Sequence, residues 1–143
     1  SMSVTIGVVG GLVATVAMTA VMKAVGDGGP PPTANLVAKF SGGEPGDHKM
    51  PGMALHLLYG VGAGAVFVAG APLAGLGFGS VAVGVGLGLA YGVALMVGGM
   101  VFWMRLVIGI EPDKETMKTF AAAHVTYGVV LGASAFVGTG FLA

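Results

Sequence analysis

Long apolar runs separated by short polar stretches dominate the chain. A helix that crosses the roughly 30 Å hydrocarbon core of a bilayer needs about 20 mostly apolar residues. Four runs reach or approach this length, at about residues 4–25, 53–73, 80–108 and 117–141. The first run has no basic residue before Lys23 and is longer than a signal-peptide core, so we interpret it as a retained helix. The pattern predicts an all-α, integral membrane four-helix bundle that forms a single transmembrane domain over residues 1–143.

The polar stretch at residues 26–52 is rich in Gly and Pro at both ends, but it contains the sequence TANLVAKF. A helix at about residues 33–40 would place Leu36, Val37 and Phe40 on one apolar side. Thr33 is a suitable residue to cap such a helix. We therefore expect a short helix here that lies in the membrane interface.

The composition is also typical of a membrane protein, and it limits the kinds of partner and chemical site that can be expected. Hydrophobic residues make up 55% of the chain and charged residues only 8%, whereas about a quarter of an average soluble domain is charged. Cysteine is absent, which excludes thiolate nucleophiles and thiolate metal sites. The formal net charge is zero, so we expect the lipid bilayer as a partner and no nucleic acid.

The basic residues indicate an orientation. All six Lys and Arg residues lie in or next to the loops at residues 26–52 and 106–116. Because basic residues beside short loops favour the cytoplasm, these two loops are predicted to be cytoplasmic and both termini outside. The protein would then be a multi-pass protein of the cell membrane, meaning the plasma or inner membrane.

A repeated motif is the main candidate for function. The sequence HLLYGVGAG begins at His56 and HVTYGVVLG begins at His124, and together they use two of the three histidines and two of the three tyrosines. The helices that carry them, the second and fourth, should run in the same direction. GLVATVAM in the first helix and GLAYGVALM in the third also resemble each other. This internal repeat predicts two parallel helical hairpins related by a pseudo-two-fold axis along the membrane normal.

Each copy of the motif places its polar rings and glycines on one face of a helix. The candidate polar or ligand site consists of His56, Tyr59, His124 and Tyr127. Small residues four apart, as in GxxxG, let helices approach closely, and we expect the polar rings beside them to be shielded from lipid. The glycines expected to pack helices are Gly60, Gly64, Gly84, Gly88, Gly92, Gly128 and Gly132.

Several interpretations of this site remain open. Each His–Tyr pair could hydrogen-bond across helices and hold the bundle together, or the pairs could line a path for a small solute or an ion. Two histidines on neighbouring helices could also bind haem b, and imidazoles with thioethers could bind Cu(I). The sequence HKMPGMALH supplies such a set in His48, Met50, Met53 and His56. The hydroxyl residues in the spans are expected to bond back to carbonyls one turn earlier; these are Thr15, Thr19, Thr126, Ser134 and Thr139.

No Ser-His-acid or zinc-ligand set is present in the sequence, so no catalytic residue, metal ligand or cofactor is predicted and an enzyme is disfavoured. Glycine ridges beyond those needed within one bundle suggest self-association. We therefore expect a structural or accessory membrane subunit, or a homo-oligomer, with the solute or ion conduit as the main alternative.

The order of motifs resembles the YagU-like family of small inner-membrane proteins. The resemblance rests on GGLVATVAMTAVMKAVG, PPPTANLVAKF, HLLYGVGAG, LAYG, GIEP and AAHVTYGVVLGASAF, which follow one another in this order. It implies four helices with paired His and Tyr-Gly positions, which here are His56, Tyr59, Gly60, His124, Tyr127 and Gly128. It implies no substrate and no reaction.

Overall fold

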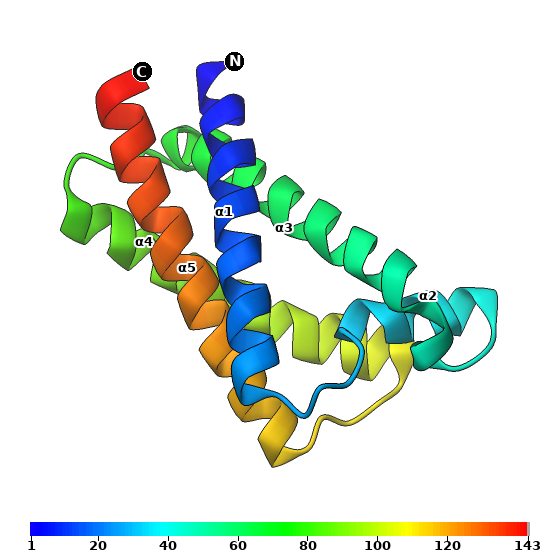
Figure 1. The fold of residues 1–143 in the computed structure, drawn as a ribbon. Helices are drawn as coiled ribbons and strands as arrows, with labels where there is room; N and C mark the ends of the chain where they lie inside the picture. The colour runs from blue at the N-terminus through cyan, green and yellow to red at the C-terminus, as the bar shows by residue number, and fades with distance from the viewer. Residues whose placement is uncertain (143) are drawn as a thin grey trace.

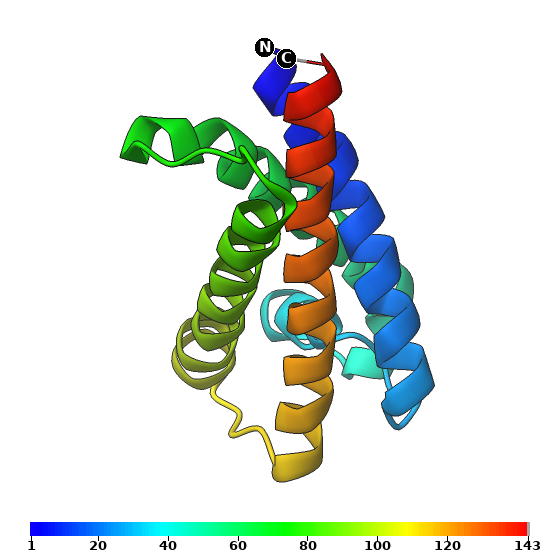
Figure 2. The ribbon, with the colours of Figure 1, turned by 90° about the vertical axis from the view of Figure 1, so that its left-hand side faces the viewer.

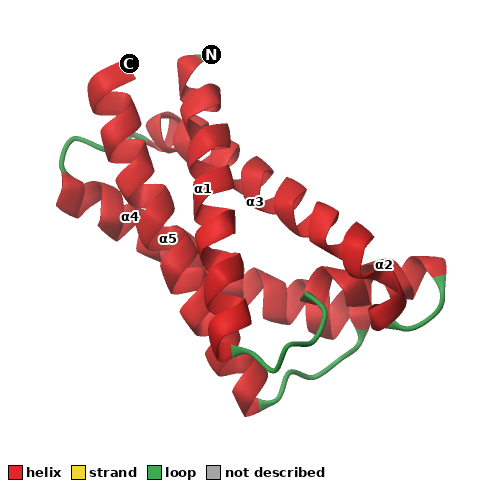
Figure 3. Cartoon of the chain, viewed as in Figure 1, coloured by secondary structure: helices red, strands yellow, loops and turns green. Residues whose placement is uncertain are grey.

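The computed structural model describes residues 1–142, and all regular structure in this range is helical (Figure 3). The α-helices are α1 (Met2–Val25), α2 (Pro32–Ser41), α3 (Lys49–Gly70), α4 (Val81–Gly98) and α5 (Lys114–Leu142). Two short 3₁₀ helices flank α3, namely η1 (Pro45–His48) and η2 (Ala71–Ala74). A π-helix, η3 (Gly99–Ile108), continues α4 without a break.

Four helical segments are long and apolar enough to cross a membrane, which confirms the predicted all-α class. They are Met2–Val25, Pro45–Ala74, Val81–Ile108 and Lys114–Phe141. α3, which forms the second of the four predicted spans, begins at Lys49, earlier than the predicted residue 53. Pro51 did not prevent this start, because proline is tolerated in the first turn of a helix, where its missing N–H would have no intrahelical partner.

The helices form two hairpins joined along one seam. α1 packs against α3, α4 packs against α5, and α1 packs against α5 to connect the hairpins. The two chain ends and the η2–α4 connection lie at one end of the molecule, called here the terminal end (Figures 1 and 2). The opposite end, called here the loop end, carries the α1–α2 and η3–α5 connections. At the loop end α2 contacts both α3 and η3 and so bridges the two hairpins.

Both hairpins cross at glycines, where backbones touch. A Cβ atom at Gly64 would lie 2.5 Å from the carbonyl oxygen of Gly7. In the other hairpin a Cβ at Gly84 would lie 2.8 Å from the carbonyl oxygen of Gly132. Side chains larger than hydrogen cannot occupy these positions unless the helices separate. All the predicted packing glycines meet the partner helix closely. Gly60 faces the side chain of Thr15, and backbone atoms face Gly64, Gly84, Gly88, Gly92, Gly128 and Gly132.

α2 is held against α3 by a hydrogen bond and a buried side chain, whereas the sequence predicted only that it lies in the membrane interface. The expected cap, Thr33, lies inside the helix, which begins after Pro31 without a side-chain cap because Pro32 already has the backbone angle of a first helical residue. The Thr33 hydroxyl instead donates a hydrogen bond to the carbonyl oxygen of Gly52 in α3. Ala34 is fully buried, and a Cβ at Gly52 would lie 2.8 Å from it. α2 therefore has a fixed position over the loop end of α3.

The start of α5 is fixed by a side-chain cap at the loop end. Oδ1 of Asp113 accepts a hydrogen bond of 2.8 Å from the backbone N–H of Thr116. Hydrogen bonds from the side chain and the backbone of Thr116 lower the pKa of Asp113, so this carboxylate stays charged at neutral pH beside the positive end of the helix dipole.

The glycine crossing generates the first prediction. Gly64→Ala should destabilise the protein by about 1–3 kcal/mol, because the new methyl group must displace the backbone of α1. Gly62→Ala, on the same helix, is the matched control, since a Cβ there meets open space. Unfolding of both variants in mild detergent with added denaturing detergent checks this. Equal stability of the two variants would show that α1 and α3 do not touch at Gly64.

Candidate functional site

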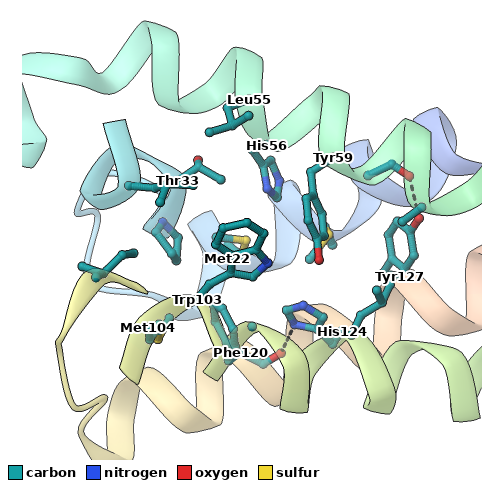
Figure 4. A pocket seen from close by; sticks show the side chains of 18 residues that line it. Met22, Thr33, Leu55, His56, Tyr59, Trp103, Met104, Phe120, His124 and Tyr127 are labelled. Carbon is teal, nitrogen blue, oxygen red and sulfur yellow. Dashed lines mark hydrogen bonds between the residues drawn. The ribbon is translucent and has the colours of Figure 1, made fainter. Parts of the chain in front are cut away.

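The four predicted site residues line a single cavity of about 180 Å³ at the loop end of the bundle (Figure 4). His56 and Tyr59 reach it from α3, whereas His124 and Tyr127 reach it from α5. The other lining residues are Met18 and Met22 of α1, Pro32, Thr33 and Leu36 of α2, Leu55, Gly60 and Ala63 of α3, Leu95 of α4, Gly99, Trp103, Met104 and Ile108 of η3, and Phe120 of α5. The structure thus brings together residues that lie far apart in the sequence.

His56 is held by a neighbouring helix through one ring nitrogen. Its Nε2 lies 3.0 Å from the hydroxyl oxygen of Thr19 in α1. That hydroxyl donates its only hydrogen to the carbonyl oxygen of Thr15, at 2.6 Å. Nε2 of His56 must therefore donate to Thr19, and a neutral imidazole with a protonated Nε2 has a bare Nδ1. His56 thus keeps one unused acceptor nitrogen.

His124 is held in the opposite tautomer. Its Nδ1 donates a hydrogen bond of 2.8 Å to the carbonyl oxygen of Phe120, one turn earlier in α5. A carbonyl cannot donate, so the proton is on Nδ1, and in the neutral ring Nε2 is bare. Because Nδ1 is tied back to its own helix, Nε2 at the tip of the ring points away from that helix. The cavity is thus lined by two imidazoles that each keep one bare nitrogen.

Tyr127 closes the cavity on the side of the terminal end. Its side chain is only 2% exposed, and its hydroxyl donates a hydrogen bond of 2.6 Å to the carbonyl oxygen of Gly60. Tyr91 of α4 makes a similar bond of 2.6 Å to the carbonyl oxygen of Ala63. The proposed His–Tyr hydrogen bonds are absent among residues 1–142. The two tyrosines do connect helices, but each hydroxyl donates to a backbone carbonyl, of Gly60 or of Ala63, and not to a histidine.

Tyr59 and Trp103 stand at the open side of the cavity. The expectation that all four polar rings would be shielded is wrong for Tyr59, whose side chain is 46% exposed. α3 packs mainly against α1 and α4 mainly against α5, so the described helices leave much of Tyr59 uncovered. The ring of Tyr59 meets that of Trp103 edge to face, with centroids 6.5 Å apart. Because Tyr59 is exposed and also lines the cavity, we infer that the cavity opens beside these two rings, between α3 and η3.

The π-helix η3 shapes the wall opposite α3. It contributes Trp103, Met104 and Ile108, and its first residue, Gly99, leaves room for the ring of Phe120. A Cβ at Gly99 would lie 3.2 Å from that ring. π-helical turns recur at functional sites because they change the direction of side chains within a helix. The apolar pattern at residues 80–108 does not distinguish an α-helix from a π-helix, so sequence reasoning missed this feature.

Thr19 and Tyr91 are the polar residues that sequence reasoning missed. The hydroxyl residues of the spans do bond to carbonyls one turn earlier, as predicted. Thr19 has a second role, since its oxygen also holds His56. The sequence could have indicated this contact, because Thr19 and His56 both lie in the loop-end half of adjacent predicted spans. Tyr91 gave no such signal, because the position three residues before it, where the repeated motif has a histidine, is Gly88.

The geometry does not fit bis-histidine haem or the Cu(I) set suggested by the sequence. Nε2, through which histidine ordinarily ligates haem iron, is engaged by Thr19 in His56. The cavity of about 180 Å³ is also smaller than the roughly 300–1,000 Å³ of pockets for drug-sized ligands. His48 bonds the carbonyl oxygen of Gly42, and Met50 is 83% exposed, so neither joins His56 in the cavity. Within residues 1–142 no group of three His, Cys, Asp or Glu side chains could hold a metal ion.

No family model, curated protein or solved structure matches the chain. The resemblance to the YagU-like family therefore stays a prediction, and the site must be interpreted from its own geometry.

The second prediction compares two tyrosines of the repeated motif. Tyr127→Phe should lower the free energy of unfolding by about 0.6–1.7 kcal/mol, because it removes a hydrogen bond within the membrane. Tyr59→Phe should change it little, since the Tyr59 hydroxyl has no hydrogen-bond partner in the part of the chain described. Reversible unfolding in detergent measures both. A larger loss for Tyr59→Phe would contradict the arrangement of the cavity.

Proposed function

We propose that the protein is a non-enzymatic membrane protein that binds a small molecule in the cavity between its two hairpins. The observation that carries this proposal is the pair of histidines, each held through one nitrogen and each left with one bare nitrogen at the cavity wall. A polar pin that served only stability would satisfy its groups within the bundle, because an unpaired polar atom in a membrane costs free energy. A ligand would supply the missing partners.

The lining favours binding over catalysis. Among the described residues that line the cavity there is no carboxylate, lysine or arginine. The Tyr127 and Thr33 hydroxyls donate to backbone carbonyls, so neither is a free nucleophile. The bare imidazole nitrogens could act as bases, but no carboxylate or lysine beside them would activate a nucleophile or complete an acid–base pair. The walls instead consist mostly of apolar and aromatic side chains, as in sites that bind small apolar molecules.

The cavity supports a binding site with one opening more directly than an open conduit. Towards the terminal end, the Tyr127–Gly60 hydrogen bond and the fully buried Leu131 and Val68 block any path. A conduit would need the glycine crossings to separate during transport. The molecule binds from the open side beside Tyr59 and Trp103, which is reached through the bilayer.

We also propose a membrane location and an orientation for the protein. The protein lies in the cell membrane with the loops at residues 26–52 and 106–116 in the cytoplasm and both termini outside. The basic residues at the loop end support this orientation, because short basic loops favour the cytoplasm. The cavity then lies in the half of the membrane nearer the cytoplasm. The equivalent glycine crossings of the two hairpins support an origin by duplication of one hairpin.

A pair of leucines tests the binding proposal. A library of molecules of single-ring size is screened in lipid nanodiscs for compounds that raise the unfolding temperature, as a ligand that binds only the folded state must. Leu55→Phe should reduce the shift of any such compound, because Leu55 lines the cavity. Leu58→Phe should leave it unchanged, because Leu58 is 70% exposed on the same helix. Equal effects of both variants, or no stabilising compound at all, would refute the proposal.

A second role, self-association, is supported by the outer face of α4. Small residues recur there at every fourth position and all are exposed, namely Ala82, Gly86, Ala90, Ala94 and Gly98. A Cβ at Gly86 or Gly98 would meet open space, so these glycines serve no contact within the described chain. Stripes of small residues let transmembrane helices pack closely. We propose that α4 pairs with a second copy of the chain or with a larger membrane complex.

The oligomer proposal has its own test. Gly86→Leu should convert the assembly to monomers, because a branched side chain keeps the two α4 backbones apart. Gly62→Leu is the control, since Gly62 is also exposed and open but lies on α3. Native mass spectrometry from lipid nanodiscs measures the mass. A monomeric unmodified protein, or dissociation by Gly62→Leu alone, would contradict pairing through α4.

A further inference from the structure

We infer that the cavity takes a single-ring aromatic molecule that carries hydroxyl groups, such as a phenol or the reduced ring of a quinol. The inference rests on the proposed binding function and adds the chemical class of the ligand. It follows from three properties of the cavity: the free hydrogen-bonding groups of its wall, its volume, and the aromatic rings that line it.

The two histidines of the wall are left with acceptors only. The N–H groups of His56 and His124 are donated to Thr19 and Phe120, and the Tyr127 hydroxyl is donated to Gly60. The bare nitrogens of the two imidazoles can only accept from an uncharged ligand. A carbonyl or ether oxygen cannot serve them, because it has no hydrogen to donate. A hydroxyl group can.

The same hydroxyl can also satisfy the donors at the opening. The indole N–H of Trp103 and the hydroxyl of Tyr59 make no hydrogen bond to another described residue, and both residues line the cavity. An aromatic hydroxyl donates through its hydrogen and accepts through its oxygen. It is therefore complementary to the imidazole nitrogens and to the groups at the opening.

The size of the cavity limits the molecule to one ring. An engineered cavity of about 150 Å³ in another protein binds benzene. The cavity of about 180 Å³ thus holds one six-membered ring with small substituents, and a longer tail must leave through the opening beside Tyr59. Fused rings and macrocycles do not fit.

The nature of the walls favours an uncharged aromatic ring over an aliphatic alcohol or an ion. Trp103 and Tyr59 flank the opening, and Phe120 lies on the opposite helix (Figure 4). Aromatic pairs in offset or edge-to-face contact contribute about 0.5–1.5 kcal/mol beyond their buried area. No charged side chain among the described lining residues would compensate an ion buried here.

The experiment compares two molecules that differ in their hydrogen-bond donors. Hydroquinone, kept reduced under argon, and 1,4-dimethoxybenzene have the same ring, but only hydroquinone can donate. Binding to the protein in lipid nanodiscs is measured by calorimetry, with empty nanodiscs subtracted. Quenching of Trp103, which is the only tryptophan in the sequence, reports whether the molecule enters the cavity. We expect hydroquinone to bind at least about tenfold more tightly than the diether, as one well-formed hydrogen bond of about 1.4 kcal/mol provides.

Two variants remove the bare nitrogens and keep the anchors. In His124→Asn the amide N–H can still donate to the Phe120 carbonyl, but Nε2 is lost. In His56→Gln the amide N–H can still donate to Thr19, but Nδ1 is lost. Each variant should weaken hydroquinone binding about tenfold and leave the weak binding of the diether unchanged. A purely structural role of the histidines would weaken both molecules equally, and unchanged unfolding temperatures confirm that the anchors hold.

The outcomes separate this inference from the function on which it depends. If 1,4-dimethoxybenzene or 1,4-benzoquinone binds as tightly as hydroquinone, or if hydroquinone does not bind, the ligand class is wrong. The binding function still stands in that case if another small molecule stabilises the protein in a way that Leu55→Phe abolishes and Leu58→Phe does not. If no molecule of any class does so, both proposals fail.

Discussion

The close crossing of helices at glycine is the constraint on which the rest of the structure depends. At Gly7 and Gly64, and again at Gly84 and Gly132, backbone atoms of two helices touch, and a single methyl group would separate them. These contacts lie in the terminal half of the bundle. In the loop-end half the facing positions carry large side chains such as Met22, Trp103 and Phe120, so the helices cannot approach in the same way. The same crossings that hold the hairpins together therefore leave space between them further along.

The cavity is this space, and the pseudo-symmetry of the chain is broken within it. His56 and His124 occupy equivalent positions, yet one is held by a neighbouring helix and the other by its own. Tyr59 and Tyr127 are equivalent too, yet Tyr59 flanks the opening while Tyr127 is buried beneath it. α2 adds to this asymmetry, because it packs against α3 and also contacts η3. Two hairpins that carry the same motif thus enclose one asymmetric site with a closed side and an open side.

Apolar length and repeated motifs were sufficient to predict the four spans, the two hairpins and the four ring-bearing residues of the cavity. They could not predict hydrogen-bond partners, since these depend on the register and rotation of helices that are distant in sequence. The bond from Tyr91 to the carbonyl of Ala63 is an example, because a backbone acceptor has no sequence signature. The exposure of Tyr59 was missed for a related reason: a helical face can be predicted from spacing, but whether a neighbour covers it depends on the whole bundle.

The central claim is that the bundle fixes two neutral imidazoles in opposite tautomers, each with one bare nitrogen at the cavity. Nitrogen-15 NMR of the histidine rings in lipid bilayers at neutral pH tests it most directly, because protonated and bare ring nitrogens have distinct chemical shifts. Signals are assigned by removing one histidine at a time. We expect a protonated Nε2 with a bare Nδ1 in His56, and the reverse in His124. The same tautomer in both rings, or two charged imidazoles, would contradict it.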